Sequence, residues 1–187
     1  MSAVAGAPLP YWRLSGFYFA YFALLGGVAP FLSLYFESLG FSPARIGELV
    51  AIPMLMRCIA PNLWGWLGDA TGQRLLIVRV GALLTALCFA GIFWRQDYWW
   101  LAAIMALHSF FWHAVLPQFE AITLAHLGSQ SARYSQLRLW GSVGFILTVV
   151  LLGLLLQRAG MAVYPMAMFG IMLLIAVCST LVPQPPR

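Results

Sequence analysis

The chain has 187 residues, of which 63% are hydrophobic and only 8% are charged, with a mean hydropathy of +0.89 and a formal net charge of +5. An average soluble domain has roughly 25% charged residues, so this composition excludes an ordinary soluble domain and indicates a membrane protein. Every basic residue is an arginine and the arginines are scattered singly, which argues against the clustered basic surface of a nucleic-acid-binding protein.

Six apolar segments follow one another along the chain, each long enough for a hydrocarbon core that takes about 20 helical residues. Their predicted ranges are Tyr11–Phe36, Pro43–Leu67, Arg74–Trp94, Tyr98–His126, Tyr134–Gln157 and Met161–Val182. Lipid cannot satisfy exposed backbone groups, so spanning segments form helices or closed barrels, and continuous apolar runs without alternation exclude the barrel. The sequence predicts an all-α integral membrane protein with six transmembrane helices.

The two ends of the chain differ in composition from the six segments. Residues 1–10 lack a basic region and a cleavage site, so we expect a short tail before an uncleaved first span. Residues 183–187 are rich in proline, which ends a helix and is typical of a linker. The predicted domains are therefore a tail over 1–10, a six-helix bundle over 11–182 and the start of a linker over 183–187.

A short polar turn joins the second and third segments. It has the order Gly65-x-Leu67-x-Asp69-x-x-Gly72-x-Arg74. This order resembles the loop signature between helices 2 and 3 of the major facilitator superfamily of secondary transporters, with a departure at Ala70, where many members carry a basic residue. The resemblance implies a conformational gate loop formed by Gly65, Asp69, Gly72 and Arg74. We expect Asp69 to cap the third helix and to stabilise one gate state.

Two further stretches narrow the resemblance. They are Tyr134 to Phe145, with an arginine before a Gly-Ser-x-Gly-aromatic run, and the first segment with Phe19-x-Tyr21-Phe22, Gly26, Pro30-Phe31 and Tyr35. Both resemble the branch that holds oligosaccharide–proton and nucleoside–proton symporters and phenylpropionate-type permeases. The resemblance implies the N-terminal six-helix half of a twelve-helix transporter, built from two inverted three-helix repeats. Its implied partners are small-molecule substrates and protons, the lipid bilayer, and a missing C-terminal half or a second copy.

The orientation in the membrane follows weakly from charge and more firmly from the resemblance. Arginines near the segment ends favour a cytoplasmic N-terminus by a small margin. The resemblance places the Gly-Asp-Gly loop in the cytoplasm and implies a multi-pass protein of the bacterial inner membrane. The arginines assigned to the cytoplasmic side are Arg13, Arg74, Arg79, Arg133 and Arg187, and those assigned to the outer side are Arg45, Arg95 and Arg158.

Charges within membrane helices are the main functional candidates, because each costs a few kcal/mol at the bilayer centre. Arg57 lies near the middle of the second segment. Either it faces a central cavity as a cation for an anionic or hydroxylated substrate, or it packs against backbone carbonyls of a neighbouring helix.

Glu120 and Arg138 lie at similar predicted depths, about 9 Å and 6 Å from the same side, at 1.5 Å per residue. They occupy sequence-adjacent antiparallel helices, so we expect an ion pair near the cytoplasmic gate. The pair serves either a gate that breaks and reforms or a fixed link between the two helices.

Three further residues are candidates for substrate binding or coupling. His113 is either a proton relay to Glu120 or a simply hydrogen-bonded histidine. Tyr18 and Tyr21 on the first helix either face the cavity, where an aromatic ring can stack on a solute, or pack within the bundle. No metal site, cofactor or catalytic residue is predicted.

The predicted function is secondary active transport of a small solute such as a sugar, nucleoside or aromatic acid, with proton coupling. An alternative is a truncated membrane binding or assembly protein without transport. An intramembrane enzyme is a weaker alternative. A zinc protease needs H-E-x-x-H, which His108 and His113 do not match. A serine protease needs a histidine partner for Ser142, and no histidine occurs in the sequence after His126.

Overall fold

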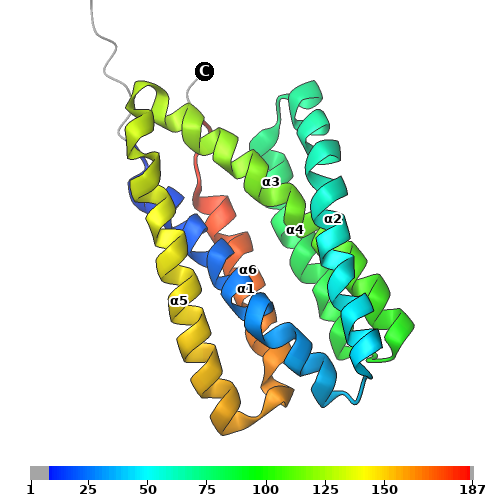
Figure 1. Ribbon diagram of the computed structural model, residues 1–187. Coiled ribbons are helices and arrows are strands. Elements are labelled where there is room, and N and C mark those ends of the chain that lie inside the picture. The colour runs from blue at the N-terminus through cyan, green and yellow to red at the C-terminus, as the bar shows by residue number, and fades with distance from the viewer. Residues whose placement is uncertain (1–8, 186–187) are drawn as a thin grey trace, which may run out of the picture.

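The computed structural model describes residues 9–185, and the described part contains helices and no strands. Its elements are α1 (Tyr11–Ser38), α2 (Pro43–Thr71), α3 (Arg74–Phe89), η1 (Ala90–Phe93), α4 (Tyr98–Leu127), η2 (Gly128–Arg133), α5 (Tyr134–Ala159), η3 (Met161–Val163) and α6 (Tyr164–Leu181). The all-α prediction is confirmed (Figure 1). Of the predicted tail and linker, residues 1–8 and 186–187 lie outside the described residues.

Five segments are long and apolar enough to cross a membrane. One of these, Tyr98–Ala159, contains both α4 and α5, so the finding agrees with six spanning helices. The third span is completed by η1, which directly follows α3.

Local sequence signals set several helix ends. Asp97 caps α4 by accepting a hydrogen bond of 3.2 Å from the backbone N–H of Trp100, as N-cap acids do. Pro43 begins α2, where its missing N–H has no cost. Gly72 ends α2 in the left-handed region at φ 66°, which a residue with a side chain rarely adopts. Helix α2 therefore runs four residues beyond its predicted end at Leu67.

The six helices form two interleaved units of three consecutive helices, α1–α3 and α4–α6. The second helix of each unit packs mainly on the first helix of the other: α5 lies along α1, and α2 lies along α4. Helices α3 and α6 contact each other and pack on α4 and α1 respectively. This exchange fits two three-helix repeats. Both ends of the described chain lie at the same end of the bundle as the α2–α3 and α4–α5 connections (Figure 1).

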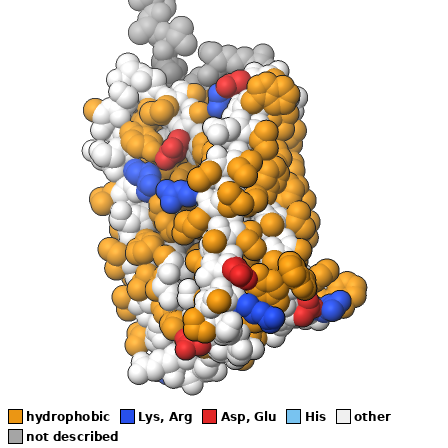
Figure 2. All heavy atoms as spheres, turned by 45° about the vertical axis from the view of Figure 1, so that its right-hand side comes forward, with side chains coloured by type: hydrophobic (Ala, Val, Ile, Leu, Met, Phe, Trp, Pro, Cys, Tyr) orange, Lys and Arg blue, Asp and Glu red, His pale blue; other side chains and the backbone are white. Residues whose placement is uncertain are grey.

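The outer surface of the bundle is apolar over most of its height. Large side chains are more than 40% exposed on α3, α5 and α6, among them Leu83, Leu87, Ile146, Leu151 and Val177. Figure 2 shows charged side chains in groups near the two ends and in one group between them, with apolar side chains covering much of the remaining visible face. Such a surface suits lipid and not water.

Small residues bring α1 and α5 into backbone contact. A Cβ atom at Gly144 of α5 would collide with the carbonyl oxygen of Phe19, and a Cβ at Gly26 of α1 would lie 2.6 Å from the carbonyl oxygen of Phe145. Small residues permit this close approach in membrane bundles, where packing and not hydrophobic burial drives helix association. The two glycines thus fix how α5 lies along α1.

Gly144→Ala is expected to destabilise the protein by about 1–3 kcal/mol, the usual cost of overpacking, although alanine is the better helix former by about 1 kcal/mol. Gly153→Ala on the same helix is the matched control, because its Cβ would meet only the Phe31 ring at 3.4 Å. The thermal unfolding midpoint in detergent micelles measures both. A Gly144→Ala protein as stable as the control would contradict the packing argument.

Candidate functional site

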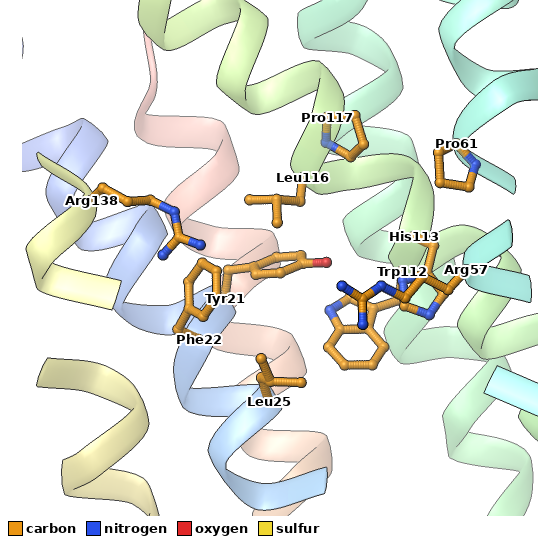
Figure 3. A pocket seen from close by; sticks show the side chains of 10 residues that line it. All are labelled: Tyr21, Phe22, Leu25, Arg57, Pro61, Trp112, His113, Leu116, Pro117 and Arg138. Carbon is orange, nitrogen blue, oxygen red and sulfur yellow. The ribbon is translucent and has the colours of Figure 1, made fainter. Parts of the chain in front are cut away.

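A cavity of about 320 Å³ lies between α1, α2, α4 and α5. Helices α1 and α5 form one packed pair and α2 and α4 form another, and the cavity lies between the two pairs (Figure 3). Its lining combines aromatic and aliphatic side chains with two arginines and a histidine: Tyr21, Phe22, Leu25, Arg57, Pro61, Trp112, His113, Leu116, Pro117 and Arg138. Apolar walls with a few convergent polar groups are typical of a small-molecule site.

Arg57 contributes its guanidinium group to the cavity from α2 (Figure 3). The side chain forms no ion pair or hydrogen bond with any residue in 9–185 that the structure describes. Of the two interpretations of Arg57 drawn from sequence, the cavity-facing one matches its position. Pro61 follows it by one helical turn, and because proline has no N–H, the Arg57 carbonyl also lacks its usual helical partner.

Arg138 enters the same cavity from α5, and its charge is partly matched. Its guanidinium carbon lies 3.7 Å from the ring centre of Phe22, and its Nε is 3.9 Å from Oε1 of Glu120 on α4. The hydroxyl of Tyr134 donates a hydrogen bond of 3.1 Å to the same Glu120 oxygen. The structure therefore brings Glu120 and Arg138 together, as their matched depths predict, at the edge of the cavity.

The two tyrosines of α1 differ in position. Tyr21 lines the cavity, and its ring is only 4% exposed. Tyr18 does not line it: the residue is fully buried and its hydroxyl donates a 3.2 Å hydrogen bond to Oγ1 of Thr123. Of the two alternatives for Tyr18, packing within the bundle matches its position, because the ring lies between α1 and α4, edge-on to Phe119.

His113 lines the cavity but is held by α2. Its Nε2 lies 3.1 Å from the carbonyl oxygen of Pro53, and the ring stacks near that of Trp112 at 5.0 Å between centroids. Glu120 takes its hydrogen bond from Tyr134 and its ion pair from Arg138 instead. The structure therefore favours the hydrogen-bonded histidine over the relay.

The residues predicted as a gate loop form a compact network at the end of α2. Arg74 pairs with Asp69 and donates a 2.9 Å hydrogen bond to Oε1 of Gln118 on α4. Gln118 in turn donates 2.9 Å to the carbonyl oxygen of Trp64. A Cβ at Gly68 would lie 2.5 Å from Oε1 of Gln118, so this glycine makes room for the amide. The network ties α2, α3 and α4 together.

Asp69 does not cap α3, contrary to expectation. It lies in the last turn of α2, which extends to Thr71, while the residue before α3 is Gln73 and provides no side-chain cap. A carboxylate there faces the negative end of the helix dipole, an unfavourable position that Arg74 offsets. Gly65 has open space around its Cα, so contacts within the described residues do not explain a glycine at that position.

Two residues of this region were missed by sequence reasoning. Gln118 is only 1% exposed and bridges α2 to α3, and Trp112 lines the cavity. Neither residue carries a charge, so the criterion of a charge within a membrane segment does not select them. An uncharged amide in an apolar helix was the available signal for Gln118.

The sequence of the chain is similar to known transporters. A profile of the MFS_1 like family matches residues 11–186. The maltose permease of Geobacillus stearothermophilus is 32% identical over 176 residues, which cover 91% of this chain and 43% of the permease. The probable 3-phenylpropionic acid transporter of Escherichia coli (strain K12) is 28% identical over 172 residues, 89% of this chain and 45% of the transporter. A multi-drug resistance efflux pump PmrA homolog of Lactococcus lactis is 29% identical over 141 residues, which cover 72% of this chain and 34% of the pump.

The chain belongs to the MFS_1 like family of the major facilitator superfamily. The resemblance read from the loop signature is confirmed, and so is the prediction of a multi-pass membrane protein of a transporter family, not an enzyme family. The chain spans less than half the length of these relatives, in keeping with a six-helix half of the superfamily fold.

The hydrogen bonds of Gln118 allow a direct test of what holds the α2–α3 junction together. Gln118→Met keeps the side-chain volume but removes both hydrogen bonds, so the α2–α3 junction is expected to lose about 1–3 kcal/mol of local stability. Amide hydrogen exchange over 64–74 should speed up accordingly. Gln130→Met, at an exposed position that accepts a bond only from Arg133, is the control. Unchanged exchange in Gln118→Met would show that the amide does not hold the junction.

The Glu120–Arg138 pair is tested by a double-mutant cycle. Glu120→Gln and Arg138→Gln should each destabilise the protein more than the double substitution does, because one unmatched charge in a low-dielectric site is worse than none. Thermal unfolding of the four proteins gives a coupling expected at about 0.5–3 kcal/mol for groups in contact. Strictly additive losses would refute the pairing.

Proposed function

We propose that the protein acts in secondary active transport, moving a small amphiphilic solute by alternating access with protons as the coupling ion. The observation that carries this proposal is the placement of Glu120 beside the cavity and in contact with Arg138. Among the acids of the described residues, Glu120 alone forms an ion pair with an arginine that lines the cavity.

The pair supports a simple coupling scheme. An ionised Glu120 holds Arg138 by charge attraction and accepts the hydrogen bond of Tyr134. Protonation removes the negative charge, so the attraction between the α4 and α5 side chains falls and Arg138 is released toward the cavity. A proton and a solute can thereby act on the same element, as coupled transport requires.

The site residues take distinct roles in this proposal. Arg57, Arg138 and Tyr21 contact the solute, Glu120 carries the proton, and His113 holds α2 against α4 through Pro53. Asp69, Gly72 and Arg74, with Gly65, form the gate loop that stabilises one state of the cycle. Tyr18 supports Glu120 indirectly, because its ring packs edge-on to that of Tyr134 at 6.3 Å between centroids.

The wider setting is also part of the proposal. A second six-helix unit, from the same polypeptide or from another copy, closes the open side of the cavity, since alternating access needs two units that move against each other. The end of the bundle that holds Arg13, Arg74, Arg79 and Arg133 is cytoplasmic, in line with the positive-inside rule. The bacterial sources of the named relatives support placement in the inner membrane.

Proteoliposomes that hold the complete gene product test the transport proposal. Uptake of sugars, nucleosides and aryl acids is measured with and without an imposed pH gradient. We expect one solute class to accumulate only with the gradient. Glu120→Gln should abolish gradient-driven accumulation while leaving solute exchange across the membrane intact, because only the proton step is lost.

Glu37→Gln is the control, since this acid is exposed at the end of α1 and far along the helix from the cavity. Solute binding without any flux would replace the transporter proposal with that of a binding protein. Gradient-driven accumulation in Glu120→Gln would remove Glu120 from coupling.

A further inference from the structure

Three hydrogen-bond donors of the cavity have no acceptor among the described residues. They are the guanidinium group of Arg57, the indole N–H of Trp112 and the hydroxyl of Tyr21. The Trp112 side chain is only 4% exposed, and its Nε1 is buried without a partner. Figure 3 shows the Tyr21 hydroxyl directed across the cavity toward the side where Arg57, Trp112 and His113 lie. A buried donor without an acceptor is costly, so an acceptor on a ligand would stabilise the Trp112 N–H. The Tyr21 hydroxyl and the exposed Arg57 guanidinium group are open to the same acceptor.

The charge balance of the cavity points in the same direction. Two guanidinium groups line it and no carboxylate does. Glu120 lies 3.9 Å from Arg138 and offsets that charge, while Arg57 forms no ion pair in the described part of the chain. A single unmatched cation costs a few kcal/mol in the membrane interior. A ligand anion would supply the missing charge, whereas a sugar hydroxyl would supply only a hydrogen bond.

The rest of the lining is apolar and limits the body of the ligand. Phe22, Leu25, Pro61, Leu116 and Pro117 surround the polar groups, and the ring of Trp112 lies 5.7 Å from that of Tyr21. A volume of about 320 Å³ is at the small end of ligand sites. An aryl ring or a short alkyl chain fits such walls, with one charged group directed to the donors.

We infer that the cavity is a carboxylate site, in which Arg57, Trp112 and Tyr21 bind the carboxylate of a small amphiphilic organic acid. This inference rests on the proposed function, since it names the solute class that the same cavity transports. Arg57 supplies the charge and up to two parallel N–H donors, the geometry that matches a carboxylate. Trp112 and Tyr21 add neutral donors, and the apolar walls bind the remainder of the acid.

Calorimetric titration of the complete gene product in lipid nanodiscs tests the site. The probes are 3-phenylpropionate, its primary amide and maltose. The acid and its amide have the same body and differ in charge. We expect the acid to bind at least about tenfold more tightly than the amide, because a hydrogen bond to a charged group contributes about 1.5–3 kcal/mol. Equal binding of acid and amide, tighter binding of maltose, or no binding of the acid would overturn the inference.

Substitutions then assign the binding to named residues. Arg57→Gln should weaken binding of the acid by about tenfold to a hundredfold and leave binding of the amide nearly unchanged. Arg57→Lys, which keeps the charge but loses the paired donors, should recover part of the loss. Trp112→Phe should cost the acid a few-fold. Arg158→Gln, which removes an exposed arginine at the end of α5, should leave all affinities unchanged.

The two proposals fail in different ways. Accumulation of a neutral solute that binds equally well in Arg57→Gln would leave the transport proposal standing and remove the carboxylate site. Tight, Arg57-dependent binding of the acid without flux in proteoliposomes would do the reverse. Thermal unfolding midpoints of the variants guard against misfolding, and Arg57→Lys keeps the test valid if Arg57→Gln is unstable. A folded Arg57→Lys with no preference for acid over amide would also count against the site.

Discussion

The structure depends on one constraint: inside hydrocarbon, a polar group must find its partner within the bundle because no water is present to serve as one. Arg79 on α3 shows how this works at a helix end. It donates hydrogen bonds to the carbonyl oxygens of Ser179, Thr180 and Val182, at 3.3, 3.3 and 3.0 Å. These carbonyls belong to the end of α6, where no further helical N–H groups follow. The arginine thus closes α6 and joins it to α3.

The same constraint makes the seam between the two helix pairs informative. Helices α1 and α5 meet through Gly26 and Gly144 in backbone contact, and α2 lies along α4 in the other pair. Between the pairs, side chains make the connection: the rings of Phe17 and Phe119 stack at 3.7 Å, and Glu120 reaches Arg138. The cavity lies along this seam. Side-chain contacts can be exchanged at lower cost than backbone contacts, so the seam is where the packing can change most easily.

Sequence reasoning worked where a rule concerned one helix or two consecutive helices. The spans follow from apolar length, and the Glu120–Arg138 pair follows from equal depth on helices joined by a short turn. It failed where the neighbour is distant in sequence. Because α2 packs on α4 and not mainly on α1, nothing in the local pattern indicates that Gln118 contacts Trp64 and Arg74, or that His113 contacts Pro53.

The rotation of each helix about its own axis, which decides the direction its side chains face, was also not predictable from the sequence. Tyr18 and Tyr21 are three residues apart and nearly share a face, yet one is bonded to Thr123 and the other lines the cavity. The hydrophobic pattern cannot separate them, since both faces of α1 are apolar. Likewise the extension of α2 to Thr71 moved Asp69 from a presumed loop into a helix, which changed its partner from the dipole of another helix to the side chain of Arg74.

Under the proposed function, the difference between the two cavity arginines would link solute recognition to proton coupling. Arg57 is unmatched and is available to an anion, whereas Arg138 is engaged by Glu120 for as long as that acid is ionised. If a carboxylate binds at Arg57, protonation of Glu120 releases a second cation beside it and strengthens its binding. Linkage requires the reverse as well: a bound anion raises the affinity of Glu120 for its proton by the same factor. Proton and organic acid would then load together and leave together, which is the thermodynamic condition for symport.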